Sequence, residues 1–283
     1  MFSLSFAVVA AIVFAASPVD AEALMDEGSQ LLAAGRFAEA QKPLTAAVAA
    51  WKALGPNYEA DFARAQNNLA TAFRRQGQFE RAIALLEEVV KAAEVAKVER
   101  VPRLRVSLNN LATAYMYAKR PAEARSSWER AIALAPKGAP DEELARELDN
   151  LATLVLDGGG DLSEADALLR RSTMAWLALR GKDDLDYGIS LSVLGTVQMR
   201  REQYPAARKT LGQALKVQAK TLGPEHPDVG ALLNLLGELE VRDGHPAVAR
   251  PYFVRSLAIA KKSLEPNHPQ RLEAEDGLRQ TRP

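Results

Sequence analysis

The sequence contains no cysteine, which excludes disulfide bonds, thiolate metal ligands and cysteine nucleophiles. It also has no excess of charge of either sign, because Lys and Arg together number 36 and Asp and Glu together number 36. A chain without surplus positive charge is poorly suited to bind a phosphate backbone or an anionic membrane surface. The balance therefore disfavours a nucleic-acid partner. What is present, 48% hydrophobic and 25% charged residues over 283 positions, is typical of a folded chain.

The longest apolar run near the start, Leu4 to Ala16, is too short to cross a bilayer, which takes about 20 apolar residues. Its length, and the small residues Val19 and Ala21 that follow, are typical of a secretory signal peptide over residues 1–21, cleaved after Ala21. No Lys or Arg precedes the run, although such signals normally begin with positive charge, so a buried first helix is the alternative. The sequence thus predicts a periplasmic or secreted protein, with a cytoplasmic location as the alternative.

One alanine recurs six times along the chain, at spacings of 42, 42, 41, 42 and 42 residues. The six copies are Ala40, Ala82, Ala124, Ala165, Ala207 and Ala249. A bulky residue follows each of them four positions later, as Leu44 and Trp128 do, which is the spacing of one helix face. Most copies are preceded by a turn with glycine, such as Gly35 or Gly77, which permits the positive φ that ends a helix. The sequence is therefore an array of internal repeats.

A second apolar stripe lies upstream of each turn, for example Leu108, Leu111 and Tyr115, and it too has helical spacing. Each copy is predicted to be a helix, a tight turn and a second helix. The first helices carry a small residue that we expect to face the small residue of the second helix: Gly28, Ala70, Ala112, Ala152, Gly195 and Gly237. Because one hairpin cannot bury both stripes, the hairpins are predicted to stack on their neighbours.

The run Asn67-Asn68-Leu69-Ala70-Thr71, repeated at residues 109–113, resembles the tetratricopeptide repeat family in its 42-residue variety, found in kinesin light chains and bacterial relatives. The loop Gly223-Pro224-Glu225-His226-Pro227 also matches the loop between repeats of that family. The resemblance implies an all-α, right-handed superhelical solenoid. Six repeats are expected within residues 22–265, at about 22–58, 59–100, 101–140, 141–183, 184–225 and 226–265, and a charged capping helix in 266–283.

No catalytic or metal-binding motif is found among the polar residues. The only three histidines include His226 and His268, which occupy equivalent loops and are interpreted as caps or turn formers. The triplet at residues 158–160 falls at a hairpin turn, and no Gly-Lys-Ser/Thr follows it. The acids at 141–143 and 183–184 precede predicted helices, where negative charge is favourable. The protein is predicted not to be an enzyme, with no cofactor and no metal; an enzyme or small-ligand binder is the least favoured alternative.

Two polar rows run along the predicted first helices. One contains Asn67, Asn109, Asp149 and Asn234, and the other contains Thr71, Thr113, Thr153 and Thr196. In the repeats that this sequence resembles, the first helices line a concave groove, so both rows would lie on its inner face. A side-chain amide both donates and accepts hydrogen bonds, as the backbone of an extended peptide requires.

Arginines stand beside these rows in the last turns of the first helices: Arg74, Arg75, Arg200 and Arg242. They suggest a locally basic groove, and hence an interaction scaffold that holds an extended protein segment or peptide with acidic residues. The alternative is that the Asn and Thr side chains are only typical surface residues of the family and that the arginines pair with neighbouring carboxylates. Self-association through the groove or an end surface is a second functional alternative.

Overall fold

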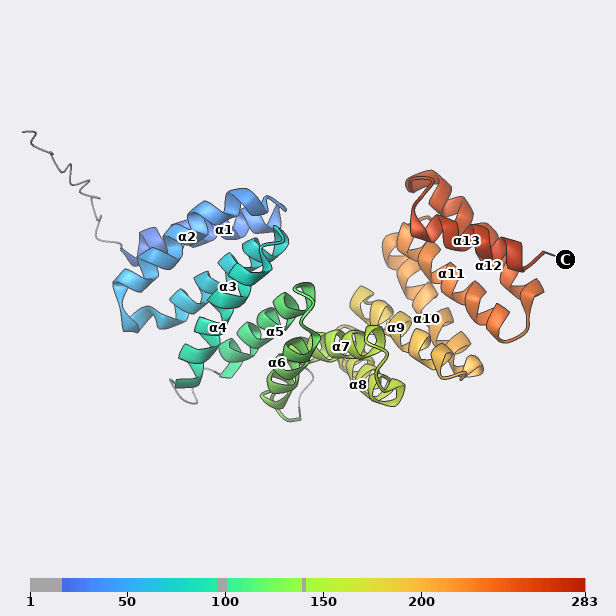
Figure 1. Cartoon of the computed structure of the whole chain (residues 1–283), viewed down its shortest axis with the longest axis horizontal. Coiled ribbons are helices and arrows are strands. Elements are labelled where there is room, and N and C mark those ends of the chain that lie inside the picture. The colour runs from blue at the N-terminus through green and yellow to red at the C-terminus, as the bar shows by residue number, and fades with distance from the viewer. Residues whose placement is uncertain (1–16, 96–100, 139–140, 283) are drawn as a thin grey trace, which may run out of the picture. The chain divides into compact units, whose positions relative to one another are not determined.

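A computed structural model of the chain describes residues 17–95, 101–138 and 141–282. The described residues form antiparallel helical hairpins joined in sequence (Figure 1), and no strand occurs among them. The helices are α1 (Pro18–Ala33), α2 (Phe37–Leu54), α3 (Glu59–Arg75), α4 (Phe79–Val95), α5 (Val101–Tyr117), α6 (Pro121–Ala133), α7 (Glu142–Asp157), α8 (Leu162–Arg180), α9 (Leu185–Arg200), α10 (Tyr204–Leu222), α11 (Pro227–Arg242), α12 (Pro246–Ser263) and α13 (Pro269–Gln280), with a short 3₁₀ turn at Pro56–Tyr58. The predicted all-α repeat fold is confirmed.

The chain divides within α6 into two compact units, Met1–Ala124 and Arg125–Pro283, which we call unit 1 and unit 2 and describe separately. In unit 1 a core cluster joins Met25 of α1 and Trp51 of α2 to Ala65 of α3. In unit 2 a corresponding cluster joins Leu191 of α9 and Leu211 of α10 to residues of α11. Each unit therefore holds its core between successive hairpins, as stacked repeats require.

The six marker alanines are all fully buried, since each has 0% of its surface exposed. The turns that precede them all contain one residue with a positive φ. It is glycine in four copies, as at Gly35 (φ 72°) and Gly77 (φ 74°), but Lys119 (φ 61°) and Glu202 (φ 60°) in the other two. The hairpin geometry thus persists in two copies where the sequence offers no glycine.

The glycines among the small residues of the first helices, Gly28, Gly195 and Gly237, lie against bulky side chains of the second helices rather than small ones, so the sequence interpretation was wrong at these three positions. A Cβ on Gly28 would lie 2.5 Å from the Leu44 side chain, and a Cβ on Gly195 would lie 2.5 Å from that of Leu211. In each of these three copies the bulky residue four positions after the marker alanine lies over the glycine. A large side chain packing into the gap left by a small one brings the helices together here.

The signal peptide predicted for residues 1–21 lies mostly outside the described residues and stays a prediction. Helix α1 begins at Pro18, with the Ser17 side chain accepting a hydrogen bond from the Asp20 amide. Ala21, the last residue of the predicted signal, is fully buried in the core of unit 1. None of the described helices combines the length and the apolar character needed to cross a membrane.

Candidate interaction surfaces

Asn67 lies between helices rather than on an open groove. Only 8% of the residue is exposed, and its amide nitrogen donates to the Ser107 hydroxyl of α5 at 2.9 Å. Its carbonyl oxygen accepts a hydrogen bond from the amide of Asn110 at 2.8 Å. Both ends of the Asn67 side chain are therefore occupied by the next first helix, and the residue links consecutive repeats.

Asn234 occupies the corresponding place in unit 2 and is 5% exposed. Its amide nitrogen donates to the backbone carbonyl of Gln270 in α13 at 2.8 Å. Asp149 of α7 is half-buried, and it accepts hydrogen bonds from Ser172, from Ser190 and, at 2.8 Å, from the Trp176 indole. Asn67, Asp149 and Asn234 of the predicted Asn–Asp row therefore form contacts between helices. Asn109, the fourth member of the row, is half-buried and also has an interaction partner.

The predicted threonine row is half-buried and bonded within its own helices. Thr71, Thr113, Thr153 and Thr196 each donate the hydroxyl proton to the backbone carbonyl four residues earlier, at 2.8 to 3.0 Å. A hydroxyl whose proton is held in this way keeps only acceptor capacity for another molecule. The row therefore offers less to a peptide backbone than its sequence pattern indicates.

Two of the four predicted groove arginines have partners in unit 2. Arg200 donates to the backbone carbonyl of Leu156 at 3.2 Å, and Arg242 forms an ion pair with Glu238 at 2.7 Å. Arg242 therefore follows the alternative that the sequence left open, in which groove arginines pair with neighbouring carboxylates.

Arg74 and Arg75 of α3 differ, because neither forms an ion pair with a described carboxylate. The Arg74 guanidinium lies over the Tyr117 ring, 5.7 Å from its centroid, and the Arg75 guanidinium lies 5.4 Å from the Phe37 ring. Tyr117 in turn stacks on Phe79 at a centroid distance of 5.8 Å. We call Arg74, Arg75, Phe79 and Tyr117 the arginine–aromatic surface of unit 1.

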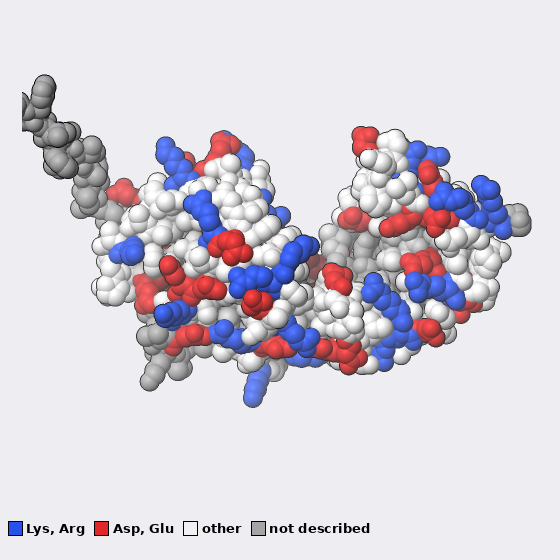
Figure 2. Space-filling view, in the orientation of Figure 1, with Lys and Arg blue, Asp and Glu red and all other residues white. Residues whose placement is uncertain are grey.

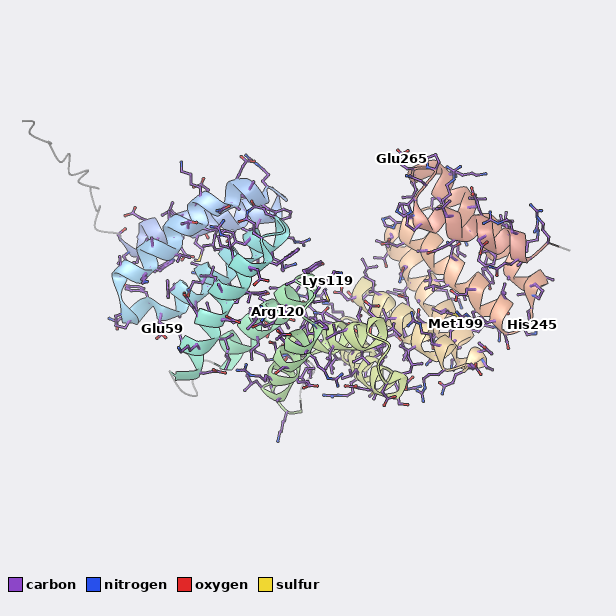
Figure 3. All side chains as sticks on the ribbon, viewed as in Figure 1. Glu59, Lys119, Arg120, Met199, His245 and Glu265 are labelled. Atoms are coloured by element: carbon purple, nitrogen blue, oxygen red, sulfur yellow. The ribbon has the colours of Figure 1, made fainter. Side chains whose placement is uncertain are left out.

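The charge of Arg74 is poorly compensated. Burial lowers the pKa of Arg74, and the adjacent positive charge of Arg75 lowers this pKa further. Further basic side chains lie near the end of α5 (Figure 2), where Figure 3 labels Lys119 and Arg120. Arg120 pairs with Glu80 and Glu123, but the exposed Lys119 forms no ion pair with a described carboxylate. The ends of α3 and α5 are therefore locally positive on a chain with no net charge.

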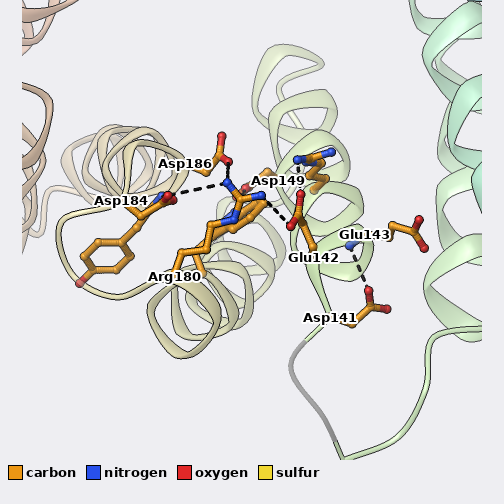
Figure 4. Close-up of polar contacts among 10 residues, drawn as sticks. Asp141, Glu142, Glu143, Asp149, Arg180, Asp184 and Asp186 are labelled. Carbon is orange, nitrogen blue, oxygen red and sulfur yellow. Dashed lines mark hydrogen bonds and ion pairs between the residues drawn. The ribbon is translucent and has the colours of Figure 1, made fainter. Parts of the chain in front are cut away.

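The acidic residues interpreted as helix starts have that role. Asp141 accepts the Glu143 amide at 3.0 Å as the N-cap of α7 (Figure 4). Asp184 accepts the Tyr187 amide at 3.2 Å as the N-cap of α9. His226 and His268 are likewise confirmed as caps, because the Nδ1 atom of each accepts an amide of α11 or α13.

One acidic cluster in unit 2 has the composition of a metal site, but an arginine side chain lies among its carboxylates. Glu240, Asp243 and His245 place ligand atoms within 4.8 Å of one another. The Arg208 guanidinium binds Glu240 at 2.6 Å and Asp243 at 2.6 Å. Because the Arg208 guanidinium already binds both carboxylates, the cluster is an ion-pair network that joins α10 to α11.

Comparison with known proteins agrees with this architecture. Tetratricopeptide repeat (TPR) family profiles match residues 20–94, 186–262 and 106–137, and so most of the chain. The chain therefore belongs to the tetratricopeptide repeat family. No curated protein matches it.

Solved structures add relatives at low identity. A protein described as a kinesin light chain of Podosopora anserina with nearly identical TPR-like repeats is 25% identical, with a TM-score of 0.61 over 71% of this chain and 97% of that one. BtubC (BKLC) from P. vanneervenii is 18% identical, with a TM-score of 0.66 over 88% and 94%. YrrB, described as a TPR protein with an unusual peptide-binding site, is 15% identical, with a TM-score of 0.52 over 76% and 92%. The fold is thus one that supports interaction scaffolds.

Proposed function

We propose that this protein is a non-catalytic scaffold that binds an acidic segment of a partner protein at the arginine–aromatic surface of unit 1. The observation that carries the proposal is the pair Arg74 and Arg75, which have aromatic neighbours but no described carboxylate partner. A carboxylate from outside the chain would supply the missing charge. Charge-assisted hydrogen bonds between a guanidinium and a carboxylate are among the stronger polar contacts in proteins.

The aromatic rings support the same proposal in a second way. Tyr117 is 47% exposed and is already stacked on Phe79, so its face is fixed before a ligand arrives. A guanidinium held over a ring loses less side-chain freedom on binding than one that moves freely in solvent. The surface is therefore partly preorganised for an anionic group.

The amide contacts expected from the sequence play a different part in this proposal. Asn67 uses its nitrogen on Ser107 and its oxygen on Asn110, so it holds α3, which carries Arg74 and Arg75, against α5, which carries Tyr117. It acts as a positioning residue beneath the surface, and the segment is bound by charge and stacking. An extended segment fits such a surface because it can present its acidic side chains side by side.

The test is fluorescence polarisation with a labelled decapeptide of alternating Glu and Ser, against the same peptide with Gln in place of Glu. We expect the double variant Arg74→Gln/Arg75→Gln to weaken binding of the acidic peptide about tenfold or more, since each charged hydrogen bond is worth roughly 1.5–3 kcal/mol. Binding by the wild type should also weaken as salt is raised.

The matched control is Lys52→Gln/Lys91→Gln, which removes two positive charges from exposed positions of the same unit. This control is expected to bind as the wild type does. Equal losses in both double variants would mean that only overall charge matters, and equal binding of the Glu and Gln peptides would refute the acidic-segment proposal.

A further inference from the structure

A cavity of about 520 Å³ lies in unit 2 between the first helix α11 and the final helix α13. Its apolar wall includes Leu235 and Val241 of α11 and Phe253 of α12. Its polar wall includes Asn234 of α11 and Glu273 of α13. An apolar wall with a few converging polar groups is the usual composition of a binding site.

The amide oxygen of Asn234 is buried and meets no hydrogen-bond donor among the described residues. The equivalent residue of unit 1, Asn67, does have such a donor, because its oxygen accepts a hydrogen bond from the Asn110 amide of the next first helix. The position of α13 that corresponds to Asn110 is Gly277, which has no side chain to donate. A Cβ at Gly277 would collide with the Phe253 ring, so the donor cannot be restored there. A buried acceptor left unpaired costs roughly 1–3 kcal/mol and marks a place where a donor is missing.

The charges on the cavity wall point to the kind of donor. Glu238 is paired with Arg242, and Asp276 is paired with Arg279. Glu273 is exposed and forms no ion pair with a described cation; its Oε2 lies 3.4 Å from the Asn234 amide nitrogen. The cavity therefore presents one uncompensated carboxylate beside one uncompensated amide oxygen.

We propose that the α11–α13 cavity binds a lysine or arginine side chain of a partner protein. The aliphatic stem of that side chain packs along Leu235 and Val241, and its N–H groups donate to Glu273 and to the Asn234 oxygen. The Asn234 oxygen is buried in the free protein, so the ligand reaches it only after a side chain of the cavity wall moves. The cation then satisfies both groups at once.

This inference is independent of the acidic-segment proposal, because the two surfaces lie in different units and select opposite charge. A partner segment with a basic residue would be recognised in unit 2, whether or not Arg74 and Arg75 in unit 1 bind an acidic one. The acidic-peptide test and the lysine-peptide test can therefore give opposite results.

The test uses the full chain and two labelled peptides of Gly and Ser, one with a central lysine flanked by leucine and the other with norleucine in place of lysine. Norleucine keeps the stem and removes the ammonium group. We expect the lysine peptide to bind at least tenfold more tightly than the norleucine peptide, and Glu273→Gln to abolish most of that difference. Glu265→Gln is the matched control, since Glu265 is an exposed carboxylate of the same unit outside the cavity (Figure 3).

Nuclear magnetic resonance of the Asn234 side-chain amide gives a readout that needs no substitution at this buried site. Its resonances should shift when the lysine peptide is added and should stay in place with the norleucine peptide. Equal affinity for the two peptides, or undiminished binding of the lysine peptide by Glu273→Gln, would overturn the proposal. So would a dimer in sedimentation that dissociates on Glu273→Gln, because the occupant would then be a second copy of this chain.

Discussion

Asp149 shows how much one residue can depend on its neighbours. Its carboxylate accepts three side-chain hydrogen bonds, one of them from the Trp176 indole at 2.8 Å. Burial nevertheless raises the pKa of Asp149 above its ordinary range, and the nearby negative charge of Asp186 acts in the same direction, while the three donors only partly oppose it. The folded protein therefore holds the Asp149 proton more tightly than the unfolded chain does.

A pH dependence of stability follows from this shift. Stability should fall as pH rises from about 4, the pKa of an unfolded aspartate, through the raised pKa of Asp149, and this contribution stays lost above it. Asp149→Asn removes the titration, so the stability of the variant relative to wild type should increase between pH 4 and pH 7. Urea unfolding followed by tryptophan fluorescence measures both proteins. A relative stability that decreased over this range would show that the hydrogen bonds dominate and that the pKa is lowered.

At the scale of the helix pair, glycines decide how closely helices approach. Gly237 of α11 lies under the Phe253 ring of α12, and a Cβ there would stand 2.6 Å from the ring. The ring is only 4% exposed and is rigid, so it cannot move aside without disturbing its neighbours. The close approach of α11 and α12 therefore requires glycine at this position.

We expect Gly237→Ala to destabilise the protein by about 1–3 kcal/mol through overpacking, although alanine is by itself the better helix former. Gly212→Ala is the matched control, because a Cβ at Gly212 of α10 meets no atom within 4 Å. It should stabilise the protein by up to about 1 kcal/mol. Chemical denaturation of both variants measures the difference, and a gain of stability in Gly237→Ala would contradict this account of the helix contact.

Helix ends were easier to foresee than helix contacts. The N-cap roles of Asp141, Asp184, His226 and His268 depend on the next few residues of the chain, and the sequence predicted them. The partner of Gly28 is Leu44, sixteen positions away on another helix, and the sequence interpretation assigned a different one. Local hydrogen bonds follow from short-range sequence, while packing partners depend on how helices rotate against each other.

At the scale of the whole molecule, the described helices contact neighbours in the chain or next neighbours, such as α3 with α5 and α11 with α13. Stability in such an array is close to a sum of local terms. Asn67 joins α3 to α5 by two hydrogen bonds, so Asn67→Ala should cost about 1–3 kcal/mol in local stability. The loss should stay close to those helices.

Hydrogen exchange measures where the loss appears. Asn67→Ala should accelerate amide exchange in α3 and α5 and leave α11 to α13 unchanged. Asn57→Ala is the control, because Asn57 is exposed in the short turn before α3. Acceleration spread evenly from α1 to α13 would mean that the chain unfolds as one cooperative body and would contradict the local description.

The sequence by itself determined the repeat, because a period counted six times in one chain records the same hairpin six times. The sequence also determined the buried alanines, the turns and the helix caps, because these features depend on residues that are close together in the chain. The candidate site was different: the Asn67 and Asn234 amides, expected in a groove, lie between helices, while Arg74 and Tyr117 meet across two of them. Only the tertiary structure decided which polar groups remain unpaired, because pairing depends on groups about 40 residues apart in the chain.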